Sequence, residues 1–390
     1  MLFFELLQIA IARRERFTHA PTAEEWGELY ALAQKQAMVG IAFRGVEQLP
    51  EAQRPPKALL MQWYMATERI KTLNTDMDRK ALAVANKFLE EGFPGMVLKG
   101  QGIAKLYERP HPNPLPRRGN SSTAENHPDG NSKQENSQFS IKEYRTPGDI
   151  DIWLHGERKD ILNYVRRHVP DCRPVYHHVD FPVIKGLDIE VHFTPSWMNS
   201  PFTNQRLQRF FDGERLRVKG EGLEAKGQQL PVPSLAFNRV YILVHIYRHL
   251  FHEGIGLRQL LDYYFVLTQG FTPEEREETM RVLHSLKMTR FTAAVMWVLQ
   301  EVYGTDSRYL LVAPDEREGR FLLSEIMLAG NFGHYDERLQ HEKGESALHW
   351  GLRKVKRNFR FVRSYPSEVL WSPLFKLWHW FWRVNALKRG

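Results

Sequence analysis

The spacing of hydrophobic residues changes twice along this chain of 390 residues, and that change limits the possible fold more than any other feature. Apolar residues recur at the 3.6-residue period of helices through residues 1–92, and again from Pro233 to about Val384. Between these regions the period becomes two, most clearly in residues 149–154 (DIDIWL). The sequence therefore predicts an α+β fold, in which a small mixed β-sheet is flanked by N-terminal and C-terminal helical regions.

Changes in composition divide the chain further. We expect a helical region over 1–92, a sheet-bearing core over 93–232 and a second helical region over 233–390. Within the core, residues 109–144 are rich in Pro, Asn, Ser, Gly and charge and contain few apolar side chains. Such a segment buries too little apolar surface to offset the entropy of ordering. We therefore interpret 109–144 as a disordered insertion.

Several short strands are expected in the core. Residues 95–100 (GMVLKG) form an apolar stretch that ends in a glycine, and Lys185-Gly186 separates two strand-like runs that predict a hairpin. A further pair of short strands is also expected. The runs of the hairpin are 176–184 and 187–193, and those of the further pair are 216–218 and 229–232.

Charge and cysteine content restrict the class of partner and compartment. The net charge is +8, and residues 351–367 hold six Lys/Arg and no acid, which favours an anionic partner. The single cysteine, Cys172, excludes an internal disulfide. No run reaches the ~20 apolar residues that a membrane span needs, and the apolar start precedes its basic residues, unlike a signal peptide. We expect a cytoplasmic protein.

Two acidic residues in residues 149–154 predict a metal site. Side chains at i and i+2 of a strand project to the same side, so Asp149 and Asp151 lie together. Adjacent carboxylates repel unless a cation lies between them, and hard oxygen ligands suit Mg²⁺ or Mn²⁺. Glu190, in the middle of the second hairpin strand, is the expected third ligand. Asp188 is the reserve candidate, and His192 is close enough along the strand to touch the site.

These motifs resemble a known family. The sequence is similar to the uncharacterised nucleotidyltransferase family of bacteria, which belongs to the DNA polymerase β-like nucleotidyltransferase superfamily. By this resemblance Gly100 is the turn glycine, Asp149 and Asp151 are the paired metal ligands, and Glu190 is the third carboxylate. The similarity rests on residues 98–100 (LKG), 106–107 (LY), 145–153 (RTPGDIDIW), 245–249 (HIYRH), 256–258 (GLR), Asp262 and 330–333 (GNFG).

The resemblance implies transfer of a nucleoside monophosphate from an NTP, with ATP expected, to an unidentified acceptor, with release of pyrophosphate. Lys99, Gln101 and Arg145 are expected to contact phosphates, although Gln101 replaces the serine usual in the superfamily. Lys99 has a second possible role, pairing with the carboxylates, and Arg145 has the alternative of an exposed loop end. The resemblance further implies that the nucleotide or acceptor pocket is lined by His249, Arg258 and Asp262.

Three other functions remain open from the sequence. The first is a regulator that binds nucleotide without turnover. The second is a metal-dependent hydrolase, because His245, His249 and His252 share one helical face and two histidines at i and i+4 can bind zinc. The third is a membrane- or nucleic-acid-associated interaction protein that works through residues 351–390. Aromatic residues of 371–382 suit peripheral contact with a membrane, and the basic run before them suits RNA or DNA. No recognised nucleic-acid-binding module is present.

Overall fold

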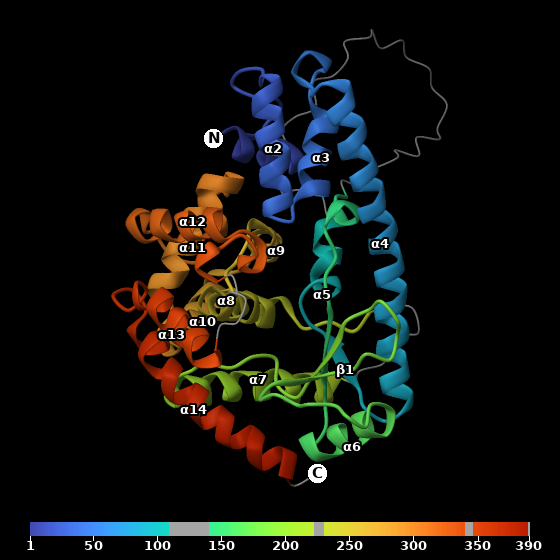
Figure 1. Ribbon diagram of the computed structural model, residues 1–390, viewed down its shortest axis with the longest axis vertical. Helices are drawn as coiled ribbons and strands as arrows, with labels where there is room; N and C mark the ends of the chain where they lie inside the picture. The colour runs from blue at the N-terminus through green and yellow to red at the C-terminus, as the bar shows by residue number, and fades with distance from the viewer. Residues whose placement is uncertain (109–139, 222–229, 340–345, 389–390) are drawn as a thin grey trace.

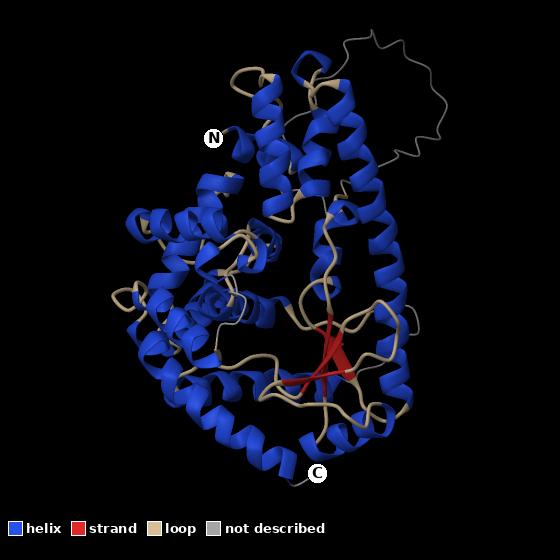
Figure 2. Cartoon of the chain, viewed as in Figure 1, coloured by secondary structure: helices blue, strands red, loops and turns tan. Residues whose placement is uncertain are grey.

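The computed structural model describes residues 1–108, 140–221, 230–339 and 346–388. It confirms the expected α+β fold, because helices surround a small sheet near one end of the molecule (Figure 2). The long helix α4 (Lys57–Glu90) runs from the N-terminal helices to the sheet (Figure 1). No helix among the described residues has both the length and the apolar character needed to cross a membrane.

The N-terminal helices begin and end where local chemistry allows. Thr22 caps its helix through a capping box with Glu25, which satisfies amide groups at the helix start. Pro56 precedes the first residue of α4, and Gly92 follows its end with a φ of 82°. These helices are α1 (Leu2–Ala10), α2 (Ala23–Lys35), α3 (Val39–Gln48), the short η1 (Glu51–Gln53) and α4.

The sheet has four strands in the order β1-β2-β4-β3. Its central pair, β2 and β4, is parallel, whereas β1 pairs antiparallel with β2 and β3 pairs antiparallel with β4. The sheet is therefore mixed, and β3 and β4 form the expected hairpin. The strands are β1 (Gly95–Val97), β2 (Ile150–Leu154), β3 (His178–Asp180) and β4 (Ile189–His192).

The two faces of the sheet differ in chemistry. Ile150, Ile152 and Leu154 join a hydrophobic core with α4 and α6 (Arg158–His168). The alternate residues of β2 face the other way, toward the C-terminal helices, because side chains alternate along a strand. One face is thus closed by helices, and the other face carries polar side chains.

The second expected strand pair is wrong. Residues 216–218 lie in α7 (Pro201–Glu221), whose buried Thr203, Leu207 and Phe211 recur at helical spacing. Residues 230–232 are not a strand, although the Val97 N–H donates to the Pro231 carbonyl at 2.9 Å. Prolines 231 and 233 lack the amide donors that a strand ladder needs. Gln229 lies outside the described residues.

The expected insertion ends earlier than residue 144. Residues 140–144 are described, and their η3 (Lys142–Tyr144) follows the buried Ile141. The Ile141 N–H donates to the Tyr107 carbonyl, and the Tyr144 hydroxyl donates to Glu47. The buried side chains and hydrogen bonds of Ile141 and Tyr144 therefore hold this segment, while residues 109–139 lie outside the described residues. The chain before it forms the short helices α5 (Gln101–Ala104) and η2 (Lys105–Glu108).

The C-terminal helices share one large hydrophobic core with α1, α2 and α3. A second core lies beneath the sheet, so residues distant in sequence pack together while the sheet keeps its own support. The elements are α8 (Leu235–His252), α9 (Leu257–Thr268), α10 (Pro273–Ser285), α11 (Thr289–Tyr303), η4 (Ser307–Tyr309), α12 (Glu316–Ala329), η5 (Asn331–Gly333), η6 (Glu337–Leu339), α13 (Ala347–Phe359) and α14 (Pro366–Lys388).

Candidate functional site

Three carboxylates meet on the polar face of the sheet. Asp149 immediately precedes β2, Asp151 lies within it, and Glu190 lies within β4. Asp151 and Glu190 are direct partners in the parallel register, while Ile150 and Ile152 point into the core on the opposite face. The structure therefore brings together the three acidic residues that the sequence singled out.

Lys99 lies between two of these carboxylates. Its Nζ is 3.1 Å from Asp149 Oδ2 and 3.1 Å from Asp151 Oδ2. Burial by itself lowers the pKa of Lys99, but Asp151 and Asp149 outweigh burial and raise that pKa above its ordinary range. Of the two roles open for Lys99, the structure adopts the pair with the carboxylates. The site thus accepts a positive charge, and its oxygen donors fit Mg²⁺ or Mn²⁺.

His192 joins the carboxylates from the neighbouring strand. Its Nε2 lies 2.8 Å from Asp151 Oδ1 and 3.2 Å from Glu190 Oε2. Burial lowers the pKa of His192, but hydrogen bonds with Asp151 and Glu190 outweigh burial and raise it to about 9. Burial likewise raises the pKa of Glu190, but His192 and other cations bring it down to about 2. At neutral pH this is a charged, hydrogen-bonded pair.

Two further histidines, missed from the sequence, extend this cluster. His178 Nδ1 lies 3.3 Å from Glu190 Oε2 and 2.8 Å from His177 Nε2. The histidines and the nearby acids form three groups whose ligand atoms are close enough to share a metal ion. The groups are His177, His178 and His192; Asp151, Glu190 and His192; and His178, Asp180 and Glu190. The sequence held a signal, because His178 and Asp180 alternate in β3 and oppose His192 and Glu190 in the hairpin.

A buried ion-pair network anchors the segment that leads into Asp149. Arg145 donates from Nε and Nη2 to the two oxygens of Asp262 at 2.7 and 2.8 Å, and the Tyr107 hydroxyl donates to the same carboxylate. Arg258 donates to the Thr146 carbonyl at 3.0 Å. Arg145 is only 4% exposed, so the alternative of an exposed loop end does not hold. Its guanidinium is engaged by Asp262, and Arg258 holds the backbone of the same segment.

The turn after β1 contains the expected glycine, Gly100. The side chain that follows, Gln101, was expected to contact phosphate and has another partner in the structure. Gly100 has a φ of 60° and ψ of −114°, a backbone conformation that disfavours other residues. The next side chain, Gln101, is buried and donates to Asp78 of α4 at 2.9 Å. Gln101 therefore holds the turn against α4, and its amide does not face the carboxylates.

The face of α8 that carries the histidine stripe lies opposite the carboxylates. His249 Nδ1 lies 3.1 Å from Glu253 Oε2, and its ring contacts His245. Burial is the first cause that lowers the pKa of His245, His249 and His252, so these rings are neutral at pH 7. None of the metal-binding groups found among the described residues includes them.

Arg248 projects from the same face and was missed from the sequence. Burial lowers the pKa of its guanidinium to about 10, which leaves it protonated at neutral pH. Its guanidinium carbon lies 3.7 Å from the centre of the Trp197 ring, and its Nε and Nη1 have no hydrogen-bond partner among the described residues. A half-buried cation with unpaired donors suits an anionic ligand.

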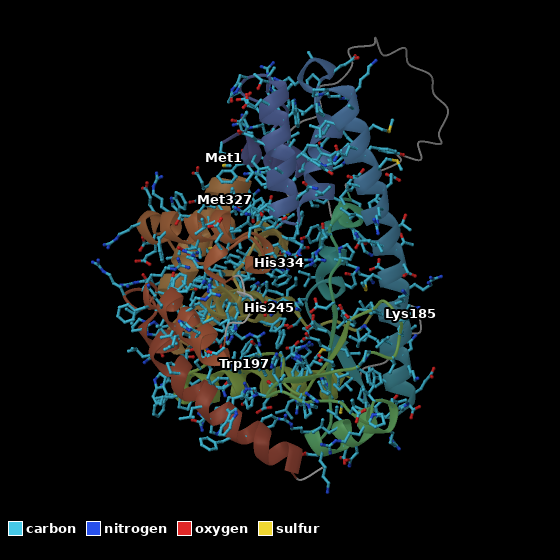
Figure 3. All side chains as sticks on the ribbon, viewed as in Figure 1. Met1, Lys185, Trp197, His245, Met327 and His334 are labelled. Atoms are coloured by element: carbon cyan, nitrogen blue, oxygen red, sulfur yellow. The ribbon has the colours of Figure 1, made fainter. Side chains whose placement is uncertain are left out.

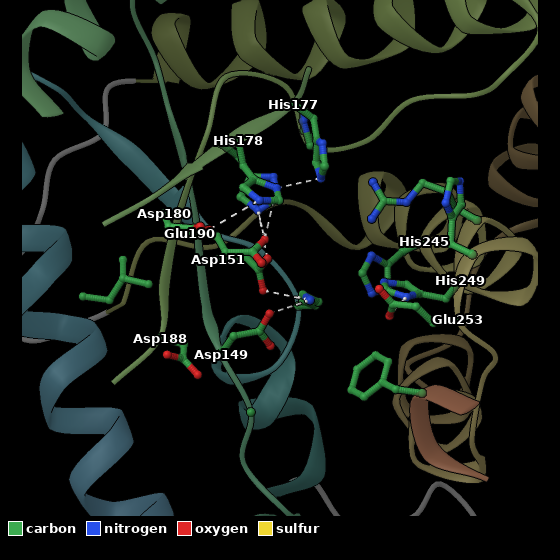
Figure 4. Close-up of a pocket in the computed structure, with 18 of the residues that line it drawn as sticks. Asp149, Asp151, His177, His178, Asp180, Asp188, Glu190, His245, His249 and Glu253 are labelled. Carbon is green, nitrogen blue, oxygen red and sulfur yellow. Dashed lines mark hydrogen bonds and ion pairs between the residues drawn. The ribbon is translucent and has the colours of Figure 1, made fainter. Parts of the chain in front are cut away.

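A cavity of about 960 Å³ separates the two walls. Figure 4 shows the carboxylates and His178 on one side and His245, His249 and Glu253 on the other. Trp197, His245 and His334 lie on the helical side, whereas Lys185 of the hairpin turn lies on the outside (Figure 3). Phe332 also lines the cavity and has a φ of 51°, a strained conformation for an aromatic residue. Such strain is most often found at functional sites.

Comparison of the sequence with known proteins identifies a family. A family model described as "Uncharacterised nucleotidyltransferase" matches residues 22–112 and 141–304, which is well over half of the chain. The match contains the carboxylates, Lys99 and the histidine stripe, and it ends before the segment 330–333 that also looked similar. No curated protein and no solved structure matches the chain. The chain therefore belongs to the uncharacterised nucleotidyltransferase family.

Proposed function

We propose that this chain transfers a nucleoside monophosphate from an NTP, with ATP as the first candidate, to a hydroxyl-bearing acceptor. The observation that carries the proposal is the convergence of Asp149 and Asp151 on the Lys99 ammonium, with Glu190 beside them. In the reaction the acceptor hydroxyl would lose its proton to solvent and its oxygen would bond to the α-phosphorus. The bond between that phosphorus and the oxygen bridging to the β-phosphate would break, and pyrophosphate would leave. Positioning and charge neutralisation account for most catalysis in such reactions.

Asp149, Asp151 and Glu190 would hold the divalent cations in this proposal, and Lys99 would turn from the carboxylates to the phosphates. When bound, Mg²⁺ or Mn²⁺ supplies charge neutralisation for the phosphates and polarises the acceptor hydroxyl. Across the cavity, Arg248 offers unpaired guanidinium donors for the triphosphate. Phe332 offers a ring against which a base can stack.

The segment before Asp149 would act by positioning. Arg145 and Asp262 tie it to α9, and Arg258 holds the Thr146 carbonyl. Rigid support of this kind keeps the first carboxylate in place while ligands enter and leave. His249, which lines the cavity beside Arg248, stays the predicted contact to nucleotide or acceptor.

The test is a thermal shift of the full chain with each of the four NTPs, with and without Mg²⁺ or Mn²⁺. Ligand binding to the folded state raises the melting temperature by mass action. We expect a metal-dependent shift that Asp149→Asn/Asp151→Asn lacks and that Asp212→Asn, an exposed acid on α7, retains. No shift with any NTP would overturn the proposal.

An acceptor screen for released pyrophosphate then separates the remaining alternatives. NTP binding without product for any acceptor would favour a nucleotide-binding regulator. Hydrolysis that is lost in His249→Ala but kept in Asp151→Asn would favour a hydrolase on the α8 face. A cytoplasmic location stays a prediction for cell fractionation to test.

We also propose that α13 and α14 contact an anionic lipid surface. Leu352, Val355 and Phe359 of α13 are exposed at helical spacing, beside the exposed Lys356. Further exposed apolar side chains lie on α14: Leu370, Leu374, Leu377, Trp378, Trp380 and Phe381. Apolar residues that insert and basic residues that meet the headgroups together suit peripheral membrane binding.

The test of this contact is co-flotation with vesicles of phosphatidylserine and phosphatidylcholine. We expect the wild type to float and Leu352→Glu/Phe359→Glu to stay in solution. Lys57→Glu, at the exposed start of α4, is the matched control for a change in charge. Equal recovery of all three proteins with the vesicles, or of none, would overturn the membrane contact.

A further inference from the structure

His177 and His178 adjoin the carboxylates but have no task in the proposed transfer. His178 begins β3 and pairs in register with His192, which places the two rings side by side with centres 5.3 Å apart. The ring of His177 lies 4.2 Å from that of His178 and 5.4 Å from that of His192. All three imidazoles line the cavity.

Four ligand atoms follow one another here at short, even distances. His177 Nε2 is 2.8 Å from His178 Nδ1, which is 3.3 Å from Glu190 Oε2, which is 3.2 Å from His192 Nε2. Zinc binds imidazole nitrogen and carboxylate oxygen at about 2.0–2.2 Å, so neighbouring ligands of one ion lie roughly 3 Å apart. Among these residues the three histidines each offer a nitrogen within 4.8 Å of the other two, which is close enough for one cation to be shared by all three.

Hydrogen bonding does not fully account for this arrangement. His178 Nδ1 faces both the His177 nitrogen and the Glu190 carboxylate, and it carries at most one hydrogen. With that hydrogen, one donor serves two acceptors. Without it, two lone pairs face each other across 3.3 Å. A cation bound by the two histidine nitrogens removes the conflict, because the Glu190 carboxylate then lies beside a positive charge.

We infer that His177, His178 and His192 form a second cation site beside Asp149, Asp151 and Glu190. We call these three histidines the histidine site. Imidazole ligands suit Zn²⁺ and other transition metals and are poor ligands for Mg²⁺. The histidine site therefore takes a transition metal, while the oxygen-only pair beside it suits a harder ion. This inference goes beyond the proposed transfer, because it needs neither an NTP nor an acceptor.

The test is titration of the chelator-treated full chain with Co²⁺ alone, followed by visible absorption. Cobalt reports nitrogen ligation by its spectrum and occupies sites built for zinc. We expect wild-type protein to bind Co²⁺, and excess Mg²⁺ to leave the spectrum unchanged. His177→Ala/His178→Ala is expected to weaken Co²⁺ binding by at least roughly 100-fold, since the loss of one supporting residue already costs 10–100-fold.

Two controls make the outcome decisive. His252→Ala, on the opposite wall of the same cavity, is expected to keep the cobalt spectrum. Asp149→Asn is expected to keep it as well while losing the NTP-dependent thermal shift, so failure of the transfer and failure of the histidine site are distinguishable. Loss of the spectrum in His252→Ala, with retention in His177→Ala/His178→Ala, would overturn the inference.

A second measurement needs no variant and so does not depend on variant folding. X-ray absorption of the wild-type cobalt complex counts imidazole ligands directly. We expect the signature of several imidazoles. A spectrum with oxygen ligands alone would place the ion on the carboxylates and overturn the histidine site.

Discussion

Two basic residues near β2, Lys99 and Arg145, each pair with aspartate, and the two contacts differ in exposure and in hydrogen-bond geometry. Lys99 meets Asp149 and Asp151 through a single ammonium at the edge of the cavity, and Asp149 is 30% exposed. Arg145 meets Asp262 through two hydrogen bonds, with side chains 4% and 8% exposed. The ammonium is a point charge on a flexible stem, whereas the guanidinium is a planar fork matched to a carboxylate.

The difference separates a cation that can be exchanged from one that is permanent. Lys99 can leave its carboxylates when other positive charge arrives, because its three donors rotate freely and the cavity offers solvent. Arg145 cannot leave Asp262 without exposing two buried charges to a medium that solvates neither. In the proposed reaction the aspartates paired with Lys99 would bind ligand, whereas the aspartate paired with Arg145 supports the backbone before β2. The predictions below test this division.

The largest expected effect is on stability at the permanent contact. Asp262→Asn leaves the buried Arg145 guanidinium without its counter-charge, and we expect the free energy of unfolding to fall by about 3–5 kcal/mol. Asp76→Asn, which breaks an exposed pair with Arg79, is the control and should cost about 0–1 kcal/mol. Urea denaturation measures both. An equal loss in the free energy of unfolding for the two variants would contradict the division into exchangeable and permanent contacts.

The next effect is on catalysis at the exchangeable contact. Asp151→Asn removes a carboxylate charge that the proposed reaction needs, and we expect kcat to fall by roughly 10³-fold, comparable to the loss of one strong electrostatic contact in other enzymes. Pyrophosphate release measures it. Asp188→Asn, at the cavity mouth beside β4, is the matched control and should retain most activity. Loss of activity in Asp188→Asn alone would show that the reserve candidate is the third ligand.

The pH dependence of stability tests the His192 contact in metal-free protein. The pKa of His192 is raised from 6.5 to about 9, so the folded state holds its proton more tightly than the unfolded state. The resulting stabilisation, at most about 3 kcal/mol, is fully present below pH ~6.5 and is lost as pH rises through ~9. Denaturation with chelator at several pH values measures it. A His192→Gln variant should lack this decline, and a decline of the same size in the variant would contradict the prediction.

The smallest expected effect is on nucleotide affinity. Arg248→Ala removes the unpaired guanidinium across the cavity, and we expect NTP binding to weaken by about 10–100-fold, the value of a hydrogen bond to a charged group. Arg248→Lys should recover part of the affinity, because it restores the charge without the fork. Isothermal titration measures both variants. Full affinity in Arg248→Ala would assign the triphosphate to Lys99 alone.

Sequence patterns predicted the parts of this protein that depend on local geometry. The alternation in residues 149–154 required Asp151 and Ile152 to face opposite sides, and the hairpin signal at Lys185-Gly186 placed Glu190 on a strand. The prediction of a second strand pair failed because the spacing of apolar residues there fits a strand as well as a helix. Residues 216–218 read equally well as a short strand, but burial at helical spacing upstream continues α7 through them.

The pairing of charged side chains was not predictable in the same way. Nothing local to Arg145 distinguishes a phosphate contact from a partner of Asp262, because the two residues are 117 positions apart. The same holds for Arg248, because the Trp197 ring that it contacts is 51 positions away in the chain. Long-range packing, which brings α9 against the segment before β2, determined those partners.

The sequence by itself therefore determined the helix and strand periods, the polar face of β2 and the set of acidic residues on it. Only the tertiary structure decided which charges pair permanently, which remain available in the cavity and which histidines meet at the carboxylates. The physical reason is that a strand or helix sets the direction of a side chain through nearest neighbours. The energy of a charge depends on burial and on partners that arrive from elsewhere in the chain.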